Sequence, residues 1–73
     1  MTNERMLAAL RQRPFRPFLI HLADGRQVAV KHPEQAAMHP QGRTVIVDQA
    51  DESWNLVDLL LVTDIEFREQ PAA

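Results

Sequence analysis

The sequence predicts a mainly β domain, in which one N-terminal helix precedes about five short antiparallel strands that form a bent sheet or a small barrel. Two observations predict this class. Short runs of apolar and β-branched residues are separated by turn-forming residues, and the only stretch with helical spacing lies before Pro14. The 73 residues have room for a single domain, 1–73, with a β core over 18–67 and a frayed tail over 70–73.

The helix is expected over residues 3–12, because Met6, Leu7 and Leu10 recur there at helical spacing. Thr2 or Asn3 is the candidate N-cap. Pro14 ends the helix, and residues 15–18 are expected to be extended because a residue before proline avoids the α region.

A β-hairpin is expected over residues 18–30, where two β-type runs flank Asp24-Gly25. A two-residue loop would pair Ile20 with Ala29. A three-residue loop, with Gly25 in the left-handed bulge position, instead places four apolar residues on one face. We predict this second register, which aligns Phe18, Ile20, Val28 and Val30.

After the hairpin, Pro33 is expected to begin a short helical turn over 32–38, followed by a turn over 39–42. Further strands are expected over 44–47, 54–57 and 62–67, with a polar turn over 50–53 and a tight apolar corner over 59–61.

Trp54, the only tryptophan, is compatible with two orientations. If Trp54 points inward together with Leu56, it belongs to the core. If Asn55 and Val57 point inward instead, Trp54 is an exposed contact residue and the best candidate for an interaction anchor.

Charge is distributed unevenly along the chain. Residues 1–43 have a net charge of +4, whereas residues 44–73 have a net charge of −6. Opposite charges on the two halves can face each other within the fold, solvate the surface, or direct head-to-tail docking and binding to a charged partner. The small core of a chain of this length favours oligomerisation.

The sequence contains no cysteine, no leader of the signal-peptide type and no apolar run of the length of a membrane span. We therefore expect a cytoplasmic protein without a membrane partner.

Residues with catalytic or metal-binding chemistry are scarce, so we expect no enzymatic activity, no cofactor and no metal. Three histidines and Glu34 match no ligand spacing: His21, His32 and His39. The only serine, Ser53, has no histidine near it in the sequence. The acids of the last strands are interpreted as a solvent-facing set: Asp58, Asp64 and Glu66.

A cluster of arginines and phenylalanines is the one segment that fits nucleic-acid binding. Arg11, Arg13 and Arg16 alternate with Phe15 and Phe18, an arrangement that can contact phosphates and stack a base. The sequence pI of about 5.8 opposes this function. The candidate interaction residues are therefore Trp54, Arg11, Arg13 and Arg16.

Several strings between Pro14 and Glu66 resemble a family of small, functionally uncharacterised bacterial proteins. They are Pro-Phe-Arg-Pro-Phe, Asp-Gly-Arg, Val-Lys-His-Pro-Glu, Gly-Arg-Thr-Val-Ile-Val and Val-Asp-Leu-Leu-Leu-Val-Thr-Asp-Ile-Glu. The resemblance implies one compact domain and carries over no catalytic or binding residue.

The order of helix, Asp-Gly-Arg hairpin, short strands and final Leu-Val-Thr-Asp-Ile-Glu strand is also similar to that of SH3-like and Sm-like small barrels, the latter of which form rings on single-stranded RNA. Where Sm-like proteins have an Asp-x-x-x-Asn arrangement and an Arg-Gly-type motif, this chain has Pro-Glu-Gln-Ala-Ala-Met and Trp-Asn-Leu-Val-Asp. No RNA-binding residue is carried over. The expected function is a non-catalytic protein-interaction or self-assembly module, with a single-stranded RNA-binding protein as the alternative.

Overall fold

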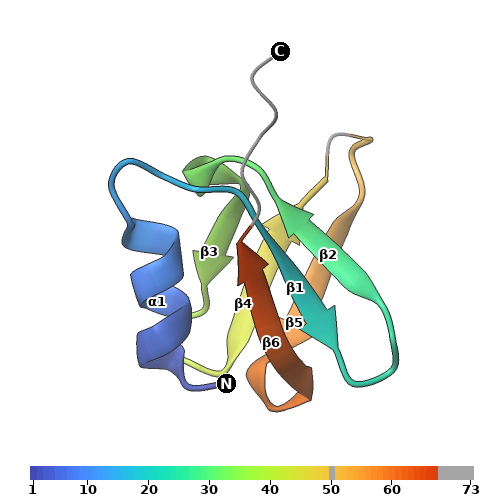
Figure 1. Ribbon diagram of the computed structural model, residues 1–73. Coiled ribbons are helices and arrows are strands. Elements are labelled where there is room, and N and C mark those ends of the chain that lie inside the picture. The colour runs from blue at the N-terminus through green and yellow to red at the C-terminus, as the bar shows by residue number, and fades with distance from the viewer. Residues whose placement is uncertain (50, 68–73) are drawn as a thin grey trace.

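A computed structural model describes residues 1–49 and 51–67. Within them the chain forms one helix, six strands and two 3-10 turns (Figure 1). In chain order these are α1 (Asn3–Arg11), β1 (Phe18–Leu22), β2 (Gln27–Val30), η1 (Pro33–Gln35), β3 (Ala36–Met38), β4 (Thr44–Asp48), β5 (Trp54–Asp58), η2 (Leu59–Leu61) and β6 (Val62–Phe67). The strands pair as two antiparallel sheets, sheet A in the order β2-β1-β6 and sheet B in the order β3-β4-β5. The predicted mainly β class is confirmed, and the two sheets do not close into a barrel.

The β1–β2 hairpin has the predicted register, in which Ile20 pairs with Val28 and Phe18 with Val30. The Leu22 N–H donates to the Arg26 carbonyl at 2.9 Å, which closes a loop of three residues, Ala23 to Gly25. Gly25 has φ +91°, a conformation that L residues avoid, and the Gly25 N–H donates to the Leu22 carbonyl at 3.0 Å. The Asp24 carboxylate accepts bonds from the Arg26 N–H and the Arg26 Nε at 3.0 and 2.8 Å.

The other edge of sheet A contains a bulge that sequence alternation did not predict. β6 pairs with β1 through Asp64 and Val62, opposite His21 and Leu22, so that Thr63 is the extra residue. Because of this extra residue, Val62 is buried and Thr63 and Asp64 are both exposed. Ile65 is half-buried and packs against the core.

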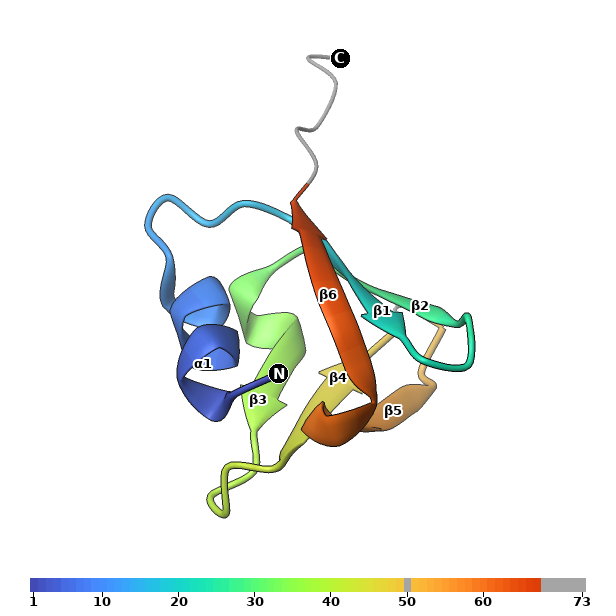
Figure 2. The same cartoon turned by 60° about the horizontal axis from the view of Figure 1, so that its bottom comes forward.

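Helix α1 ends one residue earlier than predicted and begins at the predicted cap. The Thr2 Oγ1 accepts from the Arg5 N–H at 3.2 Å. Met6 and Ala9 are its buried residues, and α1 packs beside β3 at the edge of sheet B (Figure 2). Phe15 follows the helix and packs against the buried ring of Phe18, with ring centroids 5.9 Å apart.

The segment after Pro33 differs from the expected helical turn over 32–38. Pro33 does begin a helical turn, but this turn is a single 3-10 turn. Ala36 already has extended φ and ψ of −133° and 146°, and residues 36–38 pair with β4 as a sixth strand. Pairing with a neighbouring strand satisfies the backbone groups of this segment, which a local sequence pattern cannot anticipate.

The core lies between the facing sides of the two sheets, with α1 at one side (Figures 1 and 2). Sheet A contributes its alternate inward residues, among them Phe18, Ile20, Val28 and Val30. Sheet B contributes Val45, Val47 and Val57.

Replacing Gly25 tests the hairpin register, because Gly25 has positive φ and Asp24 does not. A Cβ at Gly25 would meet no atom within 4 Å, so Gly25→Ala changes only the backbone preference. We expect it to lower the free energy of unfolding by about 1–2 kcal/mol. Urea unfolding measures this loss. Asp24→Ala, which removes exposed hydrogen bonds to Arg26, should cost less, and a larger loss for Asp24→Ala would contradict the assigned loop.

Candidate interaction surface

Large apolar side chains are exposed along one continuous segment, from β5 through η2. Within the described residues, four of the five exposed large hydrophobic side chains lie there: Trp54, Leu56, Leu60 and Leu61, with exposed fractions of 60, 61, 75 and 51%. We call these four residues the β5–η2 surface. Single exposed leucines are ordinary, whereas four large apolar side chains exposed along one strand and the turn after it make this segment a candidate site of interaction.

The outward orientation of Trp54 follows from the pairing of β5 with β4. Val45 and Val47 point into the core, and their partners across the ladder are Val57 and Asn55. Partners in an antiparallel pair share a face, so Trp54 and Leu56 point outward. Of the two orientations compatible with the sequence, the structure therefore has the exposed one. Asn55, which is half-buried, accepts a bond from the Gln49 Nε2 at 3.2 Å.

The exposure of Leu60 and Leu61 follows from the geometry of η2. A 3-10 turn has three residues per turn, so three consecutive residues point in three directions, and only Leu59 is buried. Two bonds hold the start of the turn: the Leu59 N–H donates to the Arg43 carbonyl at 2.9 Å, and the Asp58 Oδ1 accepts from the Leu60 N–H at 2.9 Å. The predicted apolar corner is thus a fixed turn that presents two leucines to solvent.

The outer face of sheet B continues the apolar character of this surface. Ala37 pairs with Ile46, and Ile46 pairs with Leu56, so the three side chains form one row across the sheet. Ala37 is exposed and Ile46 is half-buried. The row connects the outer face of sheet B to the edge strand β5.

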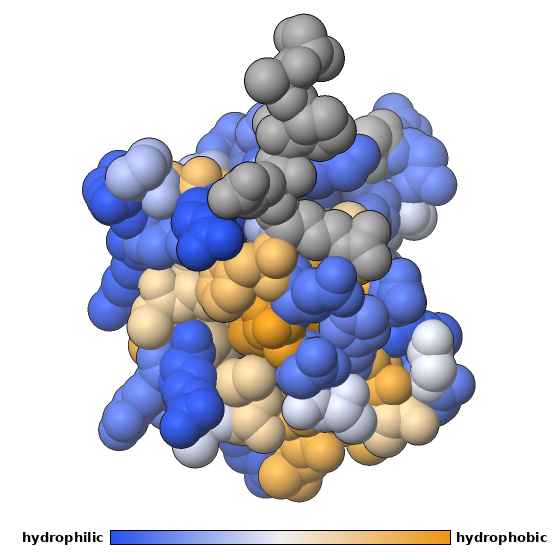
Figure 3. All heavy atoms as spheres, in the orientation of Figure 1, coloured by the Kyte–Doolittle hydropathy of each residue, from blue (hydrophilic) through white to orange (hydrophobic). Residues whose placement is uncertain are grey.

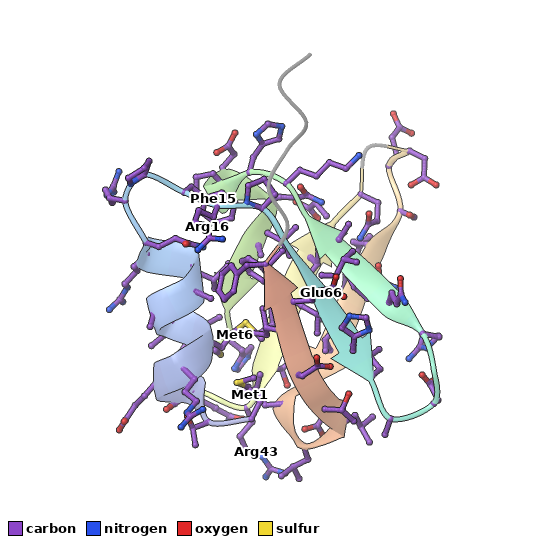
Figure 4. The ribbon with its side chains drawn as sticks, in the orientation of Figure 1. Met1, Met6, Phe15, Arg16, Arg43 and Glu66 are labelled. Carbon is purple, nitrogen blue, oxygen red and sulfur yellow. The ribbon has the colours of Figure 1, made fainter. Side chains whose placement is uncertain are left out.

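Acidic residues surround the Trp54 end of this surface. Asp48 lies opposite Trp54 in the ladder, and Asp51 and Glu52 lie in the preceding turn. The Ser53 hydroxyl, together with the Ser53 backbone N–H, donates to Asp51 and holds the pKa of that carboxyl below its ordinary value. The sequence from Thr44 to Phe67 contains no basic residue. At the other end, Arg43 lies beside η2 (Figure 4).

The three candidate arginines lie elsewhere. Arg11 is the last residue of α1, and Arg13 and Arg16 lie in the segment between α1 and β1, all three exposed. The Arg16 guanidinium is 5.3 Å from the centre of the Phe67 ring, at the end of β6. Phe67 in turn packs on Phe18, with ring centroids 5.7 Å apart. The arginines therefore belong to the side of the molecule formed by α1 and sheet A, and Trp54 belongs to sheet B.

A groove separates α1 from β6. Its volume is about 570 Å³, and its apolar lining includes Ala8, Ile65 and Phe67, with Arg5 and Asp64 as charged residues. Figure 3 shows apolar residues exposed between the helix and β6, and Met1 and Met6 lie between these two elements in Figure 4. The groove therefore combines an apolar lining with one basic and one acidic side chain.

The remaining titratable residues do not converge on one point. His21 on β1 pairs with Glu66 on β6, with the Nε2 and Oε1 atoms 2.9 Å apart. His32 precedes η1, and the His39 Nδ1 accepts from the Gln41 N–H at 3.2 Å in the 39–42 turn. Over residues 1–49 and 51–67, no group of three His, Cys, Asp or Glu side chains is placed to hold a metal ion. None of the helices in this part of the chain is long and apolar enough to cross a membrane.

The chain matches no protein-family model, no curated protein and no solved structure. Its functional assignment therefore depends on its own residues.

Glu52 lies in the turn that leads into β5. Among the described residues, it is the only non-glycine residue with positive φ, at 72°. Glycine adopts this conformation without a steric cost. We therefore expect Glu52→Gly to raise the free energy of unfolding by about 0.5–1 kcal/mol in urea unfolding. Asp24→Gly is the matched control and should lower stability, because Asp24 does not have positive φ. Destabilisation by Glu52→Gly would contradict the assigned backbone conformation.

Proposed function

We propose that this protein is a non-catalytic self-association module that binds further copies of itself through the β5–η2 surface. The observation that carries the proposal is the gathering of Trp54, Leu56, Leu60 and Leu61 on an edge strand and the turn that follows it. A cytoplasmic location, in keeping with the absence of cysteine, is part of the proposal.

The extent of the surface supports a specific but weak interface. Four large side chains that are each at least half exposed present several hundred Å² of apolar area, the order of the largest patch on a typical monomer. A standard interface buries about 800 Å² on each partner, so this patch fills roughly half of one side. The unpaired edge of β5 adds backbone groups that can bond to a partner.

Charge favours a head-to-tail arrangement over a symmetric one. Two copies meeting through the same surface would bring Asp48, Asp51 and Glu52 of each copy together, which is repulsive. The side formed by α1 and the following segment has the opposite charge, since residues 1–23 contain four arginines and one acid. The acidic, apolar β5–η2 surface therefore complements the α1 side of a second copy.

Analytical ultracentrifugation at about 50 µM tests self-association, because weak interfaces dissociate in the micromolar range. We expect a dimer or larger species for the natural chain. The double variant Trp54→Ser, Leu60→Ser should be monomeric at that concentration, since both side chains are exposed and contribute little to the fold.

Gln41→Ala, at an exposed position in the 39–42 turn, is the control and should associate as the natural chain does. High salt should weaken the association, because it screens the attraction between the acidic β5–η2 surface and the basic α1 side. A monomer of the natural chain at about 50 µM would refute the proposed function.

Binding of single-stranded RNA is the second candidate function, favoured by one observation. Arg11, Arg13 and Arg16 are all exposed, and Arg16 lies against the exposed ring of Phe67, so that charge and an aromatic face occur together. The acidic residues of sheet B limit such binding to the α1 side.

A gel-shift experiment with single-stranded RNA tests this second function. Binding through these arginines should appear at about 50 mM salt, fade steeply as salt rises, and weaken in Arg13→Ala and Arg16→Ala variants. Lys31→Ala, which removes a positive charge away from this cluster, is the control. The absence of a shift at low salt would exclude RNA binding by this surface.

A further inference from the structure

The side chain of Gln35 makes two hydrogen bonds to the backbone of β2 and the residue that follows it. Its Nε2 donates to the Ala29 carbonyl at 3.0 Å, and its Oε1 accepts from the Lys31 N–H at 2.9 Å. One primary amide therefore binds a carbonyl and an N–H that are two residues apart on the same extended segment. An adjacent parallel strand makes the same pair of bonds through the N–H and C=O of one residue, whereas an antiparallel strand would use two residues.

These two backbone groups belong to the outer edge of sheet A. β2 is the end strand of the order β2-β1-β6. The Leu22 N–H bonds to the Arg26 carbonyl, so alternation along the ladder directs the backbone groups of Val28 and Val30 toward β1. Ala29 and Lys31 consequently point away from the sheet, where a fourth strand would lie.

The position of Gln35 is set by η1. Pro33 begins this single 3-10 turn, which reverses the chain after β2 and returns Gln35 to the level of Ala29 and Lys31. A groove of about 430 Å³ surrounds the contact and is lined by Ala29, Lys31 and Gln35, together with Glu34 and Asp48. The amide therefore stands in an accessible groove beside the strand edge rather than in the core.

We propose that Gln35 is an edge guard: its amide occupies the place of a neighbouring strand and prevents β2 from pairing with a strand of a second copy. Unpaired strand edges are templates for association, and natural proteins cover or interrupt them. Removing the amide exposes the Ala29 carbonyl and the Lys31 N–H and creates an edge at which a second copy can add. This role is independent of the β5–η2 surface, which lies on the other sheet.

The test uses Gln35→Ala and Gln35→Met in a Trp54→Ser, Leu60→Ser background, the double variant that we expect to be monomeric, which keeps the β5–η2 surface out of the measurement. Methionine has a side chain of similar length but lacks the amide. It therefore removes the two hydrogen bonds to Ala29 and Lys31 and keeps most of the side-chain volume, in case alanine disturbs the turn. Gln27→Ala in the same background is the matched control, because Gln27 is an exposed glutamine on β2, the strand that Gln35 contacts.

Hydrogen exchange followed by NMR gives the first readout. At low concentration, the Lys31 amide should exchange about ten-fold faster in both Gln35 variants than in the control, the factor that one net hydrogen bond supplies. The amides of Val28 and Val30 should be unchanged, because they bond to β1. An unchanged Lys31 amide, or an equal acceleration at Val28 and Val30, would overturn the proposal.

Sedimentation gives the second readout. Both Gln35 variants should associate as concentration rises, and the Lys31 amide should regain protection in the same range, while the Gln27→Ala control stays monomeric. Gln35 variants that remain as monomeric as the control would also overturn the proposal. Because every comparison is made without Trp54 and Leu60, these outcomes do not depend on whether the natural chain self-associates.

Discussion

Two three-stranded sheets have four edge strands. The need of the backbone groups along these edges for hydrogen-bond partners is the constraint on which the rest of this structure depends. Every backbone N–H and C=O needs a hydrogen-bond partner. An edge strand whose outward groups have no protein partner is a place where another strand can bind. In a chain of 73 residues, little material is left to cover the edges once the core is formed.

The four edge strands differ in what lies beside them. β3 has three residues and packs beside α1, and β6 borders the groove that separates it from the same helix. The backbone beside β2 bonds to the Gln35 amide. β5 instead combines an unpaired edge with exposed Trp54 and Leu56, so the apolar exposure is concentrated at one of the four edges. This contrast is the physical basis for the proposal that β5 and η2 form the interface.

The distribution of charge gives such an interface a direction. Three acids, Asp48, Asp51 and Glu52, lie around Trp54, whereas the four arginines of residues 1–23 lie in α1 and the segment after it. Little of this charge is used inside the molecule: among the described residues, the ion pairs are Asp24 with Arg26, neighbours within the same loop, and His21 with Glu66 if the histidine is protonated. Charges that are not paired within one copy remain available to orient two copies.

The sequence by itself determined the elements whose cause is local. The apolar residues on either side of Asp24-Gly25 selected the three-residue loop and the β1–β2 register, Thr2 or Asn3 marked the start of α1, and the three leucines at 59–61 indicated a tight apolar corner. Each of these features depends on the backbone preference or hydrogen bonding of residues within a few positions of one another.

Only the tertiary structure decided which side of each later strand faces the core. The orientation of Trp54 depends on pairing with Val45 and Val47, the bulge at Thr63 depends on the register with β1, and β3 exists because β4 is present to bond with it. The contact of Gln35 with β2 likewise joins residues whose approach depends on a folded turn. Shifting the pairing of a strand by one residue moves every side chain to the opposite face. A run such as Val-Ile-Val or Trp-Asn-Leu-Val has apolar residues for the core in either arrangement, so the neighbouring strand decides which face is buried.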